Sequence, residues 1–352
     1  MRPLRHADVY CSAVRYAFLS LIVFLVLMLA TAGAQTNPVV MENQQPGSTG
    51  WDLDTSHAGT DAVGQIKGYA STASVNKGQN ITFYVSTNPA QTYTIDVYRV
   101  GWYQGLGGRL MQHIGPINGG TQPTCPRDAT TGKIECNWAP AYTLATLSSW
   151  TSGVYLAVLT NAQGFQNYMI FVVRDDTRVA ALLYQQPVTT YQTYNNYPND
   201  GLTAKSLYDF NSYGATLAAT GYKSAAKVSF DRPYSDSGID EGFRSDYGEV
   251  NFIRWMEQAG YDVTYATDVD THSDGDRLVN YRGFLSVGHD EYWSGPMYAA
   301  AVAARDAGVN LGFFGADALG WQIRFEPASS GVPNRVVVCY KDVGLDPITD
   351  LQ

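Results

Sequence analysis

The segment Gly288–Trp293 reads Gly-His-Asp-Glu-Tyr-Trp and has the residue types best suited to chemistry in this chain. His289 and Glu291 are two positions apart, so in an extended chain both side chains point to the same side. A histidine beside a carboxylate can bind a metal ion or share a proton transfer. The segment also fits a structural role, in which Asp290 caps a helix and His289 makes a buried hydrogen bond.

The flanking sequence predicts that this segment connects a strand to a helix. Phe284–Val287 is a short apolar run typical of a buried strand, and Ser294 can cap a helix that ends near Ala307, before Gly308. Open α/β sheets bind their ligands at the carboxyl ends of the strands. We therefore expect a ligand site at Gly288–Trp293.

Two other polar segments are expected at the same edge of the sheet. Thr190–Tyr197 is rich in tyrosine and asparagine and follows a predicted strand, and Ser229–Tyr234 closes an apolar stretch. Hydrated surface and aromatic packing explain such loops equally well.

Asp268–Gly275 resembles part of a calcium loop, but position twelve counted from Asp270 is Tyr281 and not glutamate. We interpret it as a solvated acidic turn.

Two kinds of pattern divide the chain. Residues 35–175 contain short strand-like runs between turn signals, which predicts a β-sandwich. Residues 176–352 contain strands that alternate with helices, which predicts a mostly parallel α/β sheet with helices on both faces. One of these helices is expected at Glu249–Gln258, just before Gly260. The predicted fold class is therefore a β domain followed by an α/β domain.

Composition narrows the classes of partner. The 352 residues carry a formal net charge of -9, with a pI near 5.0. An acidic chain repels nucleic-acid phosphates, so we predict no nucleic-acid partner. Beyond residue 34 only four histidines are present, and they are scattered along the sequence. A three-histidine zinc site is therefore not expected.

The N-terminus predicts export. Basic residues precede an apolar run at residues 17–30, and Ala32-Gly33-Ala34 suits a signal peptidase. The run is shorter than the roughly 20 residues that span a bilayer. An uncleaved N-terminal membrane anchor is the alternative. We predict a signal peptide at residues 1–34, a secreted or periplasmic protein, and no membrane contact after cleavage.

The cysteines agree with an oxidising compartment. Cys125 and Cys136 flank a turn-rich stretch, which predicts a disulfide across a hairpin loop. No Cys-x-x-Cys pattern or adjacent histidine supports a metal site there. Cys339 lies in the apolar run Val336–Tyr340 and is expected to be a buried free thiol.

Several segments together carry a family likeness. They are Glu42–Gly47, Ile66–Ser71, Val97–Tyr103, Gly288–Ser294, Phe313–Asp317 and Trp321–Phe325. In type and order they resemble the large (β) subunit of N,N-dimethylformamidase and secreted proteins similar to it. The resemblance implies an N-terminal β-sandwich and a flavodoxin-like C-terminal domain. That domain is similar in fold to class I glutamine amidotransferases but lacks their cysteine nucleophile. Because the family domain continues past residues 336–342, we expect it to be incomplete here.

The resemblance also implies a mononuclear iron site made of two tyrosines and one glutamate, with a histidine nearby. Matched to this chain, Glu291 is the carboxylate ligand, and His289 either supports the ligands from beside them or handles protons. A Gln-x-Tyr-Asn pattern gives Tyr194 as the first tyrosine, and Arg-Pro-Tyr gives Tyr234 as the second. Hard anionic oxygens favour Fe(III), which acidifies bound water and polarises an amide carbonyl. The implied activity is hydrolysis of an amide-type C–N bond.

A second function fits the same sequence. A non-catalytic exported protein on this scaffold could bind a carbohydrate or cell-envelope ligand through aromatic residues such as Trp102, Tyr103 and Trp138. The expected partner is a small-molecule amide in the first case and a cell-envelope ligand in the second. Both are compatible with an oligomer.

Overall fold

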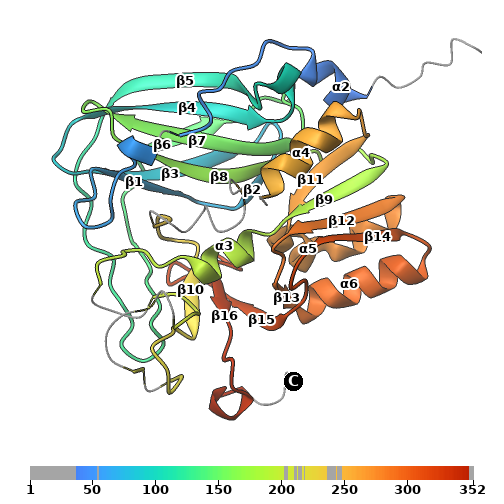
Figure 1. Cartoon of the computed structure of the whole chain (residues 1–352). Coiled ribbons are helices and arrows are strands. Elements are labelled where there is room, and N and C mark those ends of the chain that lie inside the picture. Colours follow the sequence, from blue (N-terminus) through green and yellow to red (C-terminus); the bar gives the residue numbers. More distant parts are fainter. Residues whose placement is uncertain are drawn as a thin grey trace, which may run out of the picture. The chain divides into compact units, whose positions relative to one another are not determined.

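Alternating apolar residues in the first half of the chain build two sheets. The computed structural model describes residues 37–53, 55–201, 205–209, 212, 216–217, 219–235, 243 and 248–348. The strands are β1 (Ile66–Ala70), β2 (Ser74–Asn76), β3 (Asn80–Thr87), β4 (Thr92–Val100), β5 (Gly108–Asn118), β6 (Tyr142–Ala145), β7 (Gly153–Asn161) and β8 (Gln166–Arg174). One sheet has the order β2-β8-β7-β4-β5, and the other has the order β1-β3-β6 (Figure 1).

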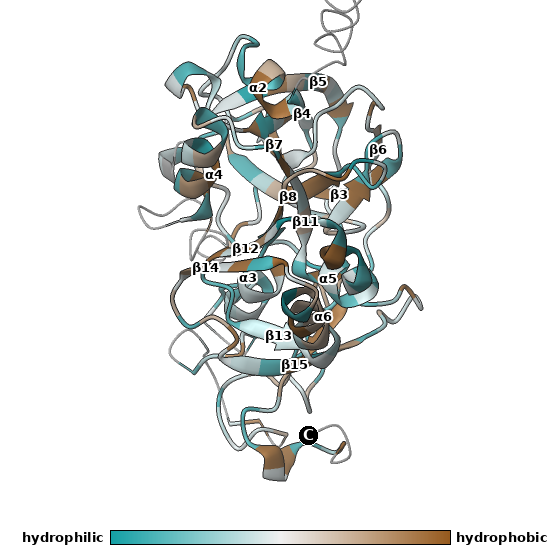
Figure 2. Ribbon diagram, turned by 90° about the vertical axis from the view of Figure 1, so that its right-hand side faces the viewer, coloured by the Kyte–Doolittle hydropathy of each residue, from teal (hydrophilic) through white to brown (hydrophobic). Residues whose placement is uncertain are grey.

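Both sheets contribute to one apolar core. Phe83 of β3 packs there with Ile95 of β4 and Phe171 of β8, and Figure 2 shows hydrophobic stretches in β3 and β8. Strands β7 and β8 are buried along most of their length. Their other face, with Leu156 and Ile170, joins a second core that includes residues of the C-terminal half. Burial on both faces explains why these strands are almost continuously apolar.

The second half contains a parallel sheet of the order β11-β9-β12-β14. Its strands are β9 (Leu182–Gln186), β11 (Val263–Thr267), β12 (Gly283–Gly288) and β14 (Asn310–Gly315), and its covering helices include α4 (Glu249–Gln258), α5 (Asp268–Asp274) and α6 (Gly295–Asp306). Ile253 of α4 packs in the same core as Leu285, whereas Met297 of α6 packs with the adjacent residue Phe284. Successive residues of a strand face opposite ways, so helices cover both faces of the sheet.

A third sheet has the order β10-β16-β15-β13, and its strand β13 begins at Tyr292, four residues after the end of β12. Its strands are β10 (Lys227–Ser229), β13 (Tyr292–Ser294), β15 (Trp321–Glu326) and β16 (Val336–Val338). The remaining elements are α2 (Pro38–Asn43), α3 (Val188–Tyr194) and the 3-10 helices η1 (Thr55–His57), η2 (Tyr103–Gly105), η3 (Gly275–Asn280) and η4 (Val343–Leu345).

The predicted fold class is confirmed in its broad form, because mixed sheets with few helices make this a β-rich α/β protein. The change from mainly antiparallel to parallel strands falls between β8 and β9, although the division into two domains at residues 175 and 176 stays a prediction. The disulfide between Cys125 and Cys136 is present, and Cys339 is a buried free thiol. The expected signal peptide lies outside the described residues. Within them, no helix has the length and apolar character needed to cross a membrane.

The predicted acidic turn at Asp268–Gly275 is wrong, because most of it forms α5. The side chain of Thr267 accepts a hydrogen bond from the backbone N–H of Asp270, and the Asp270 carboxylate accepts one from the N–H of Thr267. This reciprocal capping box satisfies donors that the first turn of a helix leaves unpaired. The acidic residues of the segment therefore begin a helix.

A buried ion pair joins the two halves of the described chain. Arg99 of β4 and Glu257 of α4 are both 0% exposed, and their side chains form two hydrogen bonds of 2.9 and 2.7 Å. The same carboxylate accepts hydrogen bonds from Asn43 and Tyr265. Because both carboxylate oxygens and both terminal guanidinium nitrogens are paired, the charges are tolerated in the interior.

We expect Arg99→Met to lower the free energy of unfolding by about 3–5 kcal/mol, because it leaves the Glu257 carboxylate buried without its cation. The double variant with Glu257→Leu should recover much of that loss. Arg305→Met is the control, since Arg305 pairs with Asp306 at 59% and 63% exposure and should cost less than about 1 kcal/mol. Urea unfolding measures all three. Equal costs for Arg99→Met and Arg305→Met would contradict this assignment.

Candidate functional site

The turn after β12 depends on a glycine. Gly288 has φ +76°, a conformation that side chains with a Cβ rarely adopt. The carboxylate of Glu249 lies 2.1 Å from where a Cβ would be, and it accepts a hydrogen bond of 3.3 Å from the backbone N–H of His289. Only glycine allows this close approach, so α4 anchors the start of the segment.

Asp290 holds the middle of the turn. It is 1% exposed, and its carboxylate accepts hydrogen bonds from Ser286 at 2.8 Å and from Gln185 at 2.7 Å. Burial raises the pKa of Asp290 to about 6. The next helix is capped by Ser294 and not by Asp290, since the Ser294 side chain accepts from the N–H of Met297. Asp290 therefore ties the turn to the parallel sheet.

Polar groups converge on the Glu291 carboxylate, which is 7% exposed. Tyr194 donates a hydrogen bond to Oε2 at 3.1 Å, and Tyr208 lies 2.6 Å from both carboxylate oxygens. His289 Nε2 is 3.1 Å from Oε2. Burial alone would raise the pKa of Glu291, but His289 and Tyr208 lower it below its usual value. The backbone N–H of Glu291 is held by Thr190.

The two tyrosines form one stacked unit. The rings of Tyr194 and Tyr208 are 4.2 Å apart between centroids, at 22°. Tyr292 donates a hydrogen bond of 2.6 Å to the hydroxyl of Tyr208, so a chain of hydrogen bonds runs from Tyr292 through Tyr208 to Glu291. Burial, with Tyr292 and Glu291 nearby, raises the pKa of Tyr208. Without a metal ion, Tyr208 therefore keeps its proton and donates a hydrogen bond to Glu291.

His289 is partly exposed, although its Nε2 atom, which faces Glu291, is buried. Its side chain is 25% exposed, and its Nε2 is 3.8 Å from Asp317 Oδ2 as well as close to Glu291. The contact with Glu291 raises the pKa of His289, although burial works against this. The imidazole is thus placed between two carboxylates and within reach of solvent, where it can gain or lose a proton.

Lys341, which we did not predict from the sequence, places a cation beside the aromatic rings of the site. Lys341 Nζ lies 3.4 Å from the centroid of the Tyr208 ring, 4.8 Å from that of Trp321 and 5.6 Å from that of Tyr292. Burial lowers the pKa of Lys341, and Glu291 opposes that effect. A cleft of about 170 Å³ lined by Lys341, Trp321 and Arg324, among others, opens on this side.

Tyr234, expected as the second tyrosine, lies elsewhere. It lines a small cavity with Tyr69, Arg232 and Gln192, and its hydroxyl interacts with Gln192. Of the residues predicted from the sequence, the structure brings Tyr194, His289 and Glu291 together, and Tyr208 stands where Tyr234 was expected. Tyr208 has no motif around it. It belongs to an irregular segment between α3 and β10, and only its place in space marks it.

The oxygen donors suit one metal ion. Ligands that are each about 2 Å from a common ion lie about 3 Å from one another, and the Tyr194 and Tyr208 hydroxyls lie 3.1 and 2.6 Å from the Glu291 carboxylate. Within the described residues there is no cluster of three His, Cys, Asp or Glu side chains that could hold a metal. Among the described residues, the oxygens beside Glu291 that could join it in holding a metal ion are the tyrosine hydroxyls.

A family model described as "N,N-dimethylformamidase beta subunit-like, C-terminal" matches residues 94–352. The chain belongs to this family. The resemblance drawn from the sequence motifs is thus confirmed, and it points to a dimethylformamidase-like hydrolase. No curated protein matches the chain.

One solved structure found by comparison is a superoxide reductase (neelaredoxin) from Ignicoccus hospitalis. It has a TM-score of 0.18 and 12% identity, over 31% of this chain and 80% of that chain. A likeness this slight bears on neither the fold nor the function of the dimethylformamidase-like chain.

The contact between His289 and Glu291 predicts a pH window in the metal-free protein. The raised pKa of His289 gives a stabilising contribution that is complete below about pH 6.5 and is lost as pH rises through the folded-state value. The lowered pKa of Glu291 gives one that is complete above about pH 4.5 and is lost as pH falls. His289→Gln should therefore cost most between about pH 4.5 and 6.5, at about 1 kcal/mol or less.

Unfolding free energies measured from pH 4 to pH 9 test this window. Asp317→Asn is the control, because the longer 3.8 Å contact should give a smaller effect. A cost of His289→Gln that grows steadily from pH 6 to pH 9 would have the wrong sign.

Proposed function

We propose that the protein is an exported, iron-dependent hydrolase of an amide-type C–N bond in a small molecule. The observation that carries the proposal is that the hydroxyls of Tyr194 and Tyr208 both meet the carboxylate of Glu291. Family membership supports the reaction class. The disulfide between Cys125 and Cys136 supports an oxidising compartment. We also propose that the two N-terminal sheets are the family's β-sandwich.

The ligand set fits a hard, highly charged ion. Two phenolates and a carboxylate are anionic oxygen donors, which prefer Fe(III) to softer metals. When bound, Fe(III) would supply Lewis acidity toward an amide carbonyl and a water molecule. Tyr208 has a raised pKa and must release its proton on binding, so affinity should increase with pH. The Lys341 ammonium beside the Tyr208 ring offsets the charge of the phenolate that results.

His289 is the residue placed to move protons. Its Nε2 is buried 3.1 Å from the Glu291 carboxylate, while 25% of the side chain is exposed. It can accept a proton from attacking water and return it to the leaving amine. Asp317, 3.8 Å away, favours the protonated imidazole that exists between these steps. Asp290 and Glu249 keep the backbone of the turn fixed while His289 changes charge.

The alternative of a non-catalytic carbohydrate- or envelope-binding protein has less support. Two of the aromatic residues expected to form its surface are interior: Tyr103 is 0% exposed and Trp138 is 6% exposed. Tyr103 donates a hydrogen bond to Glu42, and Trp138 packs on Tyr69. Neither side chain can stack on a sugar.

Single oxygen deletions test the proposal. Tyr194→Phe, Tyr208→Phe and Glu291→Gln should each weaken Fe(III) binding at least about tenfold, because each removes an anionic oxygen ligand or its charge. Tyr234→Phe is the matched control and should bind iron like the unmodified protein. Titration of metal-free protein with ferric citrate, followed by visible absorption and by bound-iron analysis, measures these affinities. Loss of iron in Tyr234→Phe with full binding in Tyr208→Phe would reverse the ligand assignment.

A further inference from the structure

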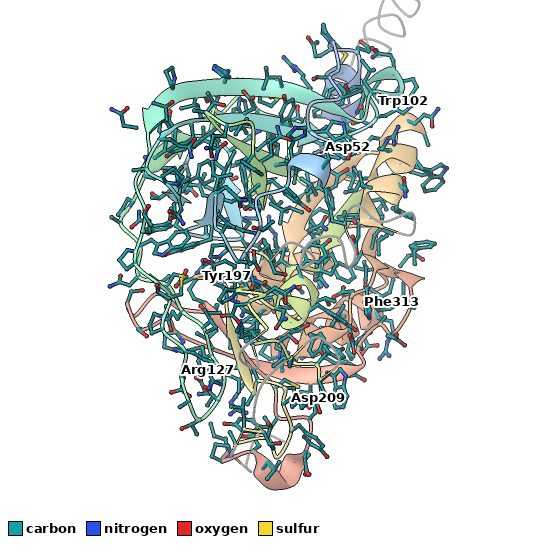
Figure 3. The ribbon with its side chains drawn as sticks, turned by 60° about the vertical axis from the view of Figure 1, so that its left-hand side comes forward. Asp52, Trp102, Arg127, Tyr197, Asp209 and Phe313 are labelled. Carbon is teal, nitrogen blue, oxygen red and sulfur yellow. A yellow bond between two sulfur atoms is a disulfide. The ribbon has the colours of Figure 1, made fainter. Side chains whose placement is uncertain are left out.

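Arg232 is a fully buried cation whose hydrogen bonds go to main-chain carbonyls. It is 0% exposed. Its guanidinium donates to the carbonyls of Gln192 at 3.1 Å, Asn195 at 2.9 Å, Lys205 at 2.9 Å and Tyr197 at 3.3 Å. Figure 3 labels Tyr197, one of these four residues. Hydrogen bonds to neutral carbonyls offset the desolvation penalty of a buried charge less well than a carboxylate does. Burying Arg232 in this way therefore lowers the stability of the fold.

Two of these carbonyls are at the end of α3. The last carbonyls of a helix lack partners inside the helix and carry partial negative charge. Gln192 and Asn195 flank Tyr194, the final residue of α3. Arg232 therefore acts as a C-terminal cap for this short helix and fixes the backbone on both sides of Tyr194.

The third carbonyl connects the cation to the other tyrosine. Lys205 is three residues before Tyr208, in a segment without helix or strand. The backbone N–H of Leu207 donates to the carbonyl of Thr193 at 2.8 Å, so the two tyrosine-bearing segments are also bonded to each other. One guanidinium thus spans both segments whose side chains stack as Tyr194 and Tyr208.

The segment that carries Arg232 is itself held in place. It follows β10, which pairs with β16. The side chain of Asn195 donates to the carbonyl of Pro233 at 3.0 Å and accepts from the N–H of Ser235 at 3.0 Å. In these bonds a side chain of the tyrosine segment contacts the backbone after β10, whereas in the Arg232 bonds a side chain after β10 contacts the backbone of the tyrosine segments. The two segments are therefore joined by side-chain hydrogen bonds from both sides, and we call this set of bonds the bracket.

We propose that Arg232 is the positioning residue of the metal-binding tyrosine pair, clamping the backbone at Gln192–Tyr197 and at Lys205 so that the two phenol oxygens meet at Glu291. The Arg-Pro-Tyr motif thus serves the site through its arginine and not through Tyr234. This inference rests on the proposed function for the purpose of the pair, whereas the clamp itself rests on the hydrogen bonds alone.

The test compares Arg232→Lys and Arg232→Met with Arg99→Lys in the full-length protein. Lysine keeps the charge but cannot donate to four carbonyls in the fork geometry of arginine. Arg99 is equally buried but contacts neither tyrosine segment, so Arg99→Lys matches the change in burial and chemistry. The two readouts are hydrogen–deuterium exchange of peptides that cover residues 190–209 and the affinity for Fe(III).

We expect both Arg232 variants to exchange at residues 190–209 at least about tenfold faster, with other core peptides unchanged. Iron affinity should fall about 10- to 100-fold, as for other residues that orient ligands. Arg99→Lys should leave both readouts near those of the unmodified protein. If exchange at residues 190–209 is unchanged in Arg232→Lys and Arg232→Met, the proposal that Arg232 clamps this backbone is wrong. Faster exchange with undiminished iron affinity overturns the positioning role.

If the unmodified protein binds no iron, the proposed function is wrong. The exchange experiment then still tests whether Arg232 holds the backbone of the tyrosine segments. If the Arg232 variants do not fold, Asn195→Ser provides the second test. It removes the reciprocal bonds to Pro233 and Ser235 but keeps the cation, and it should accelerate exchange at residues 190–209 to a smaller degree. No acceleration in that variant would count against the bracket.

Discussion

The site is organised by the hydrogen bonds and ion pair that converge on the carboxylate of Glu291. A carboxylate that is 7% exposed must be paired if it is to stay ionised. Here Tyr194, Tyr208 and His289 supply the pairing from three different segments. In the proposed function, a metal ion would bind the same oxygens that stabilise the metal-free protein, so stability and function would depend on one set of contacts.

That arrangement requires the backbone to be fixed from both sides. On the Glu291 side, the parallel sheet and α4 fix the turn through Asp290 and Gly288. On the tyrosine side there is little regular structure, and buried polar groups replace it. Arg232 bonds to carbonyls, and the segment before β1 adds a further brace where Asp61 accepts a hydrogen bond from the N–H of Asn199. A residue of the N-terminal half thus also holds the backbone of the tyrosine segment.

The turn that carries His289 and Glu291 could be predicted from the sequence, whereas Tyr208 could not. Apolar runs and capping residues predict β12, the turn and the Ser294-capped helix, and a spacing of two puts His289 and Glu291 on one side. Tyr208 could not be predicted because no periodicity constrains the residues between α3 and β10. The acidity of the residues after Thr267 suggests a turn, whereas the capping box that makes them a helix depends on hydrogen bonds between specific atoms.

The most direct measurement is anomalous diffraction at the iron edge from crystals of the protein loaded with Fe(III). The account predicts a single strong peak about 2 Å from the phenol oxygens of Tyr194 and Tyr208 and from a carboxylate oxygen of Glu291. The Tyr208 hydroxyl would then bind the metal and no longer donate to Glu291. A peak beside Tyr234, or no peak while the tyrosine hydroxyls stay hydrogen-bonded to Glu291, would contradict it.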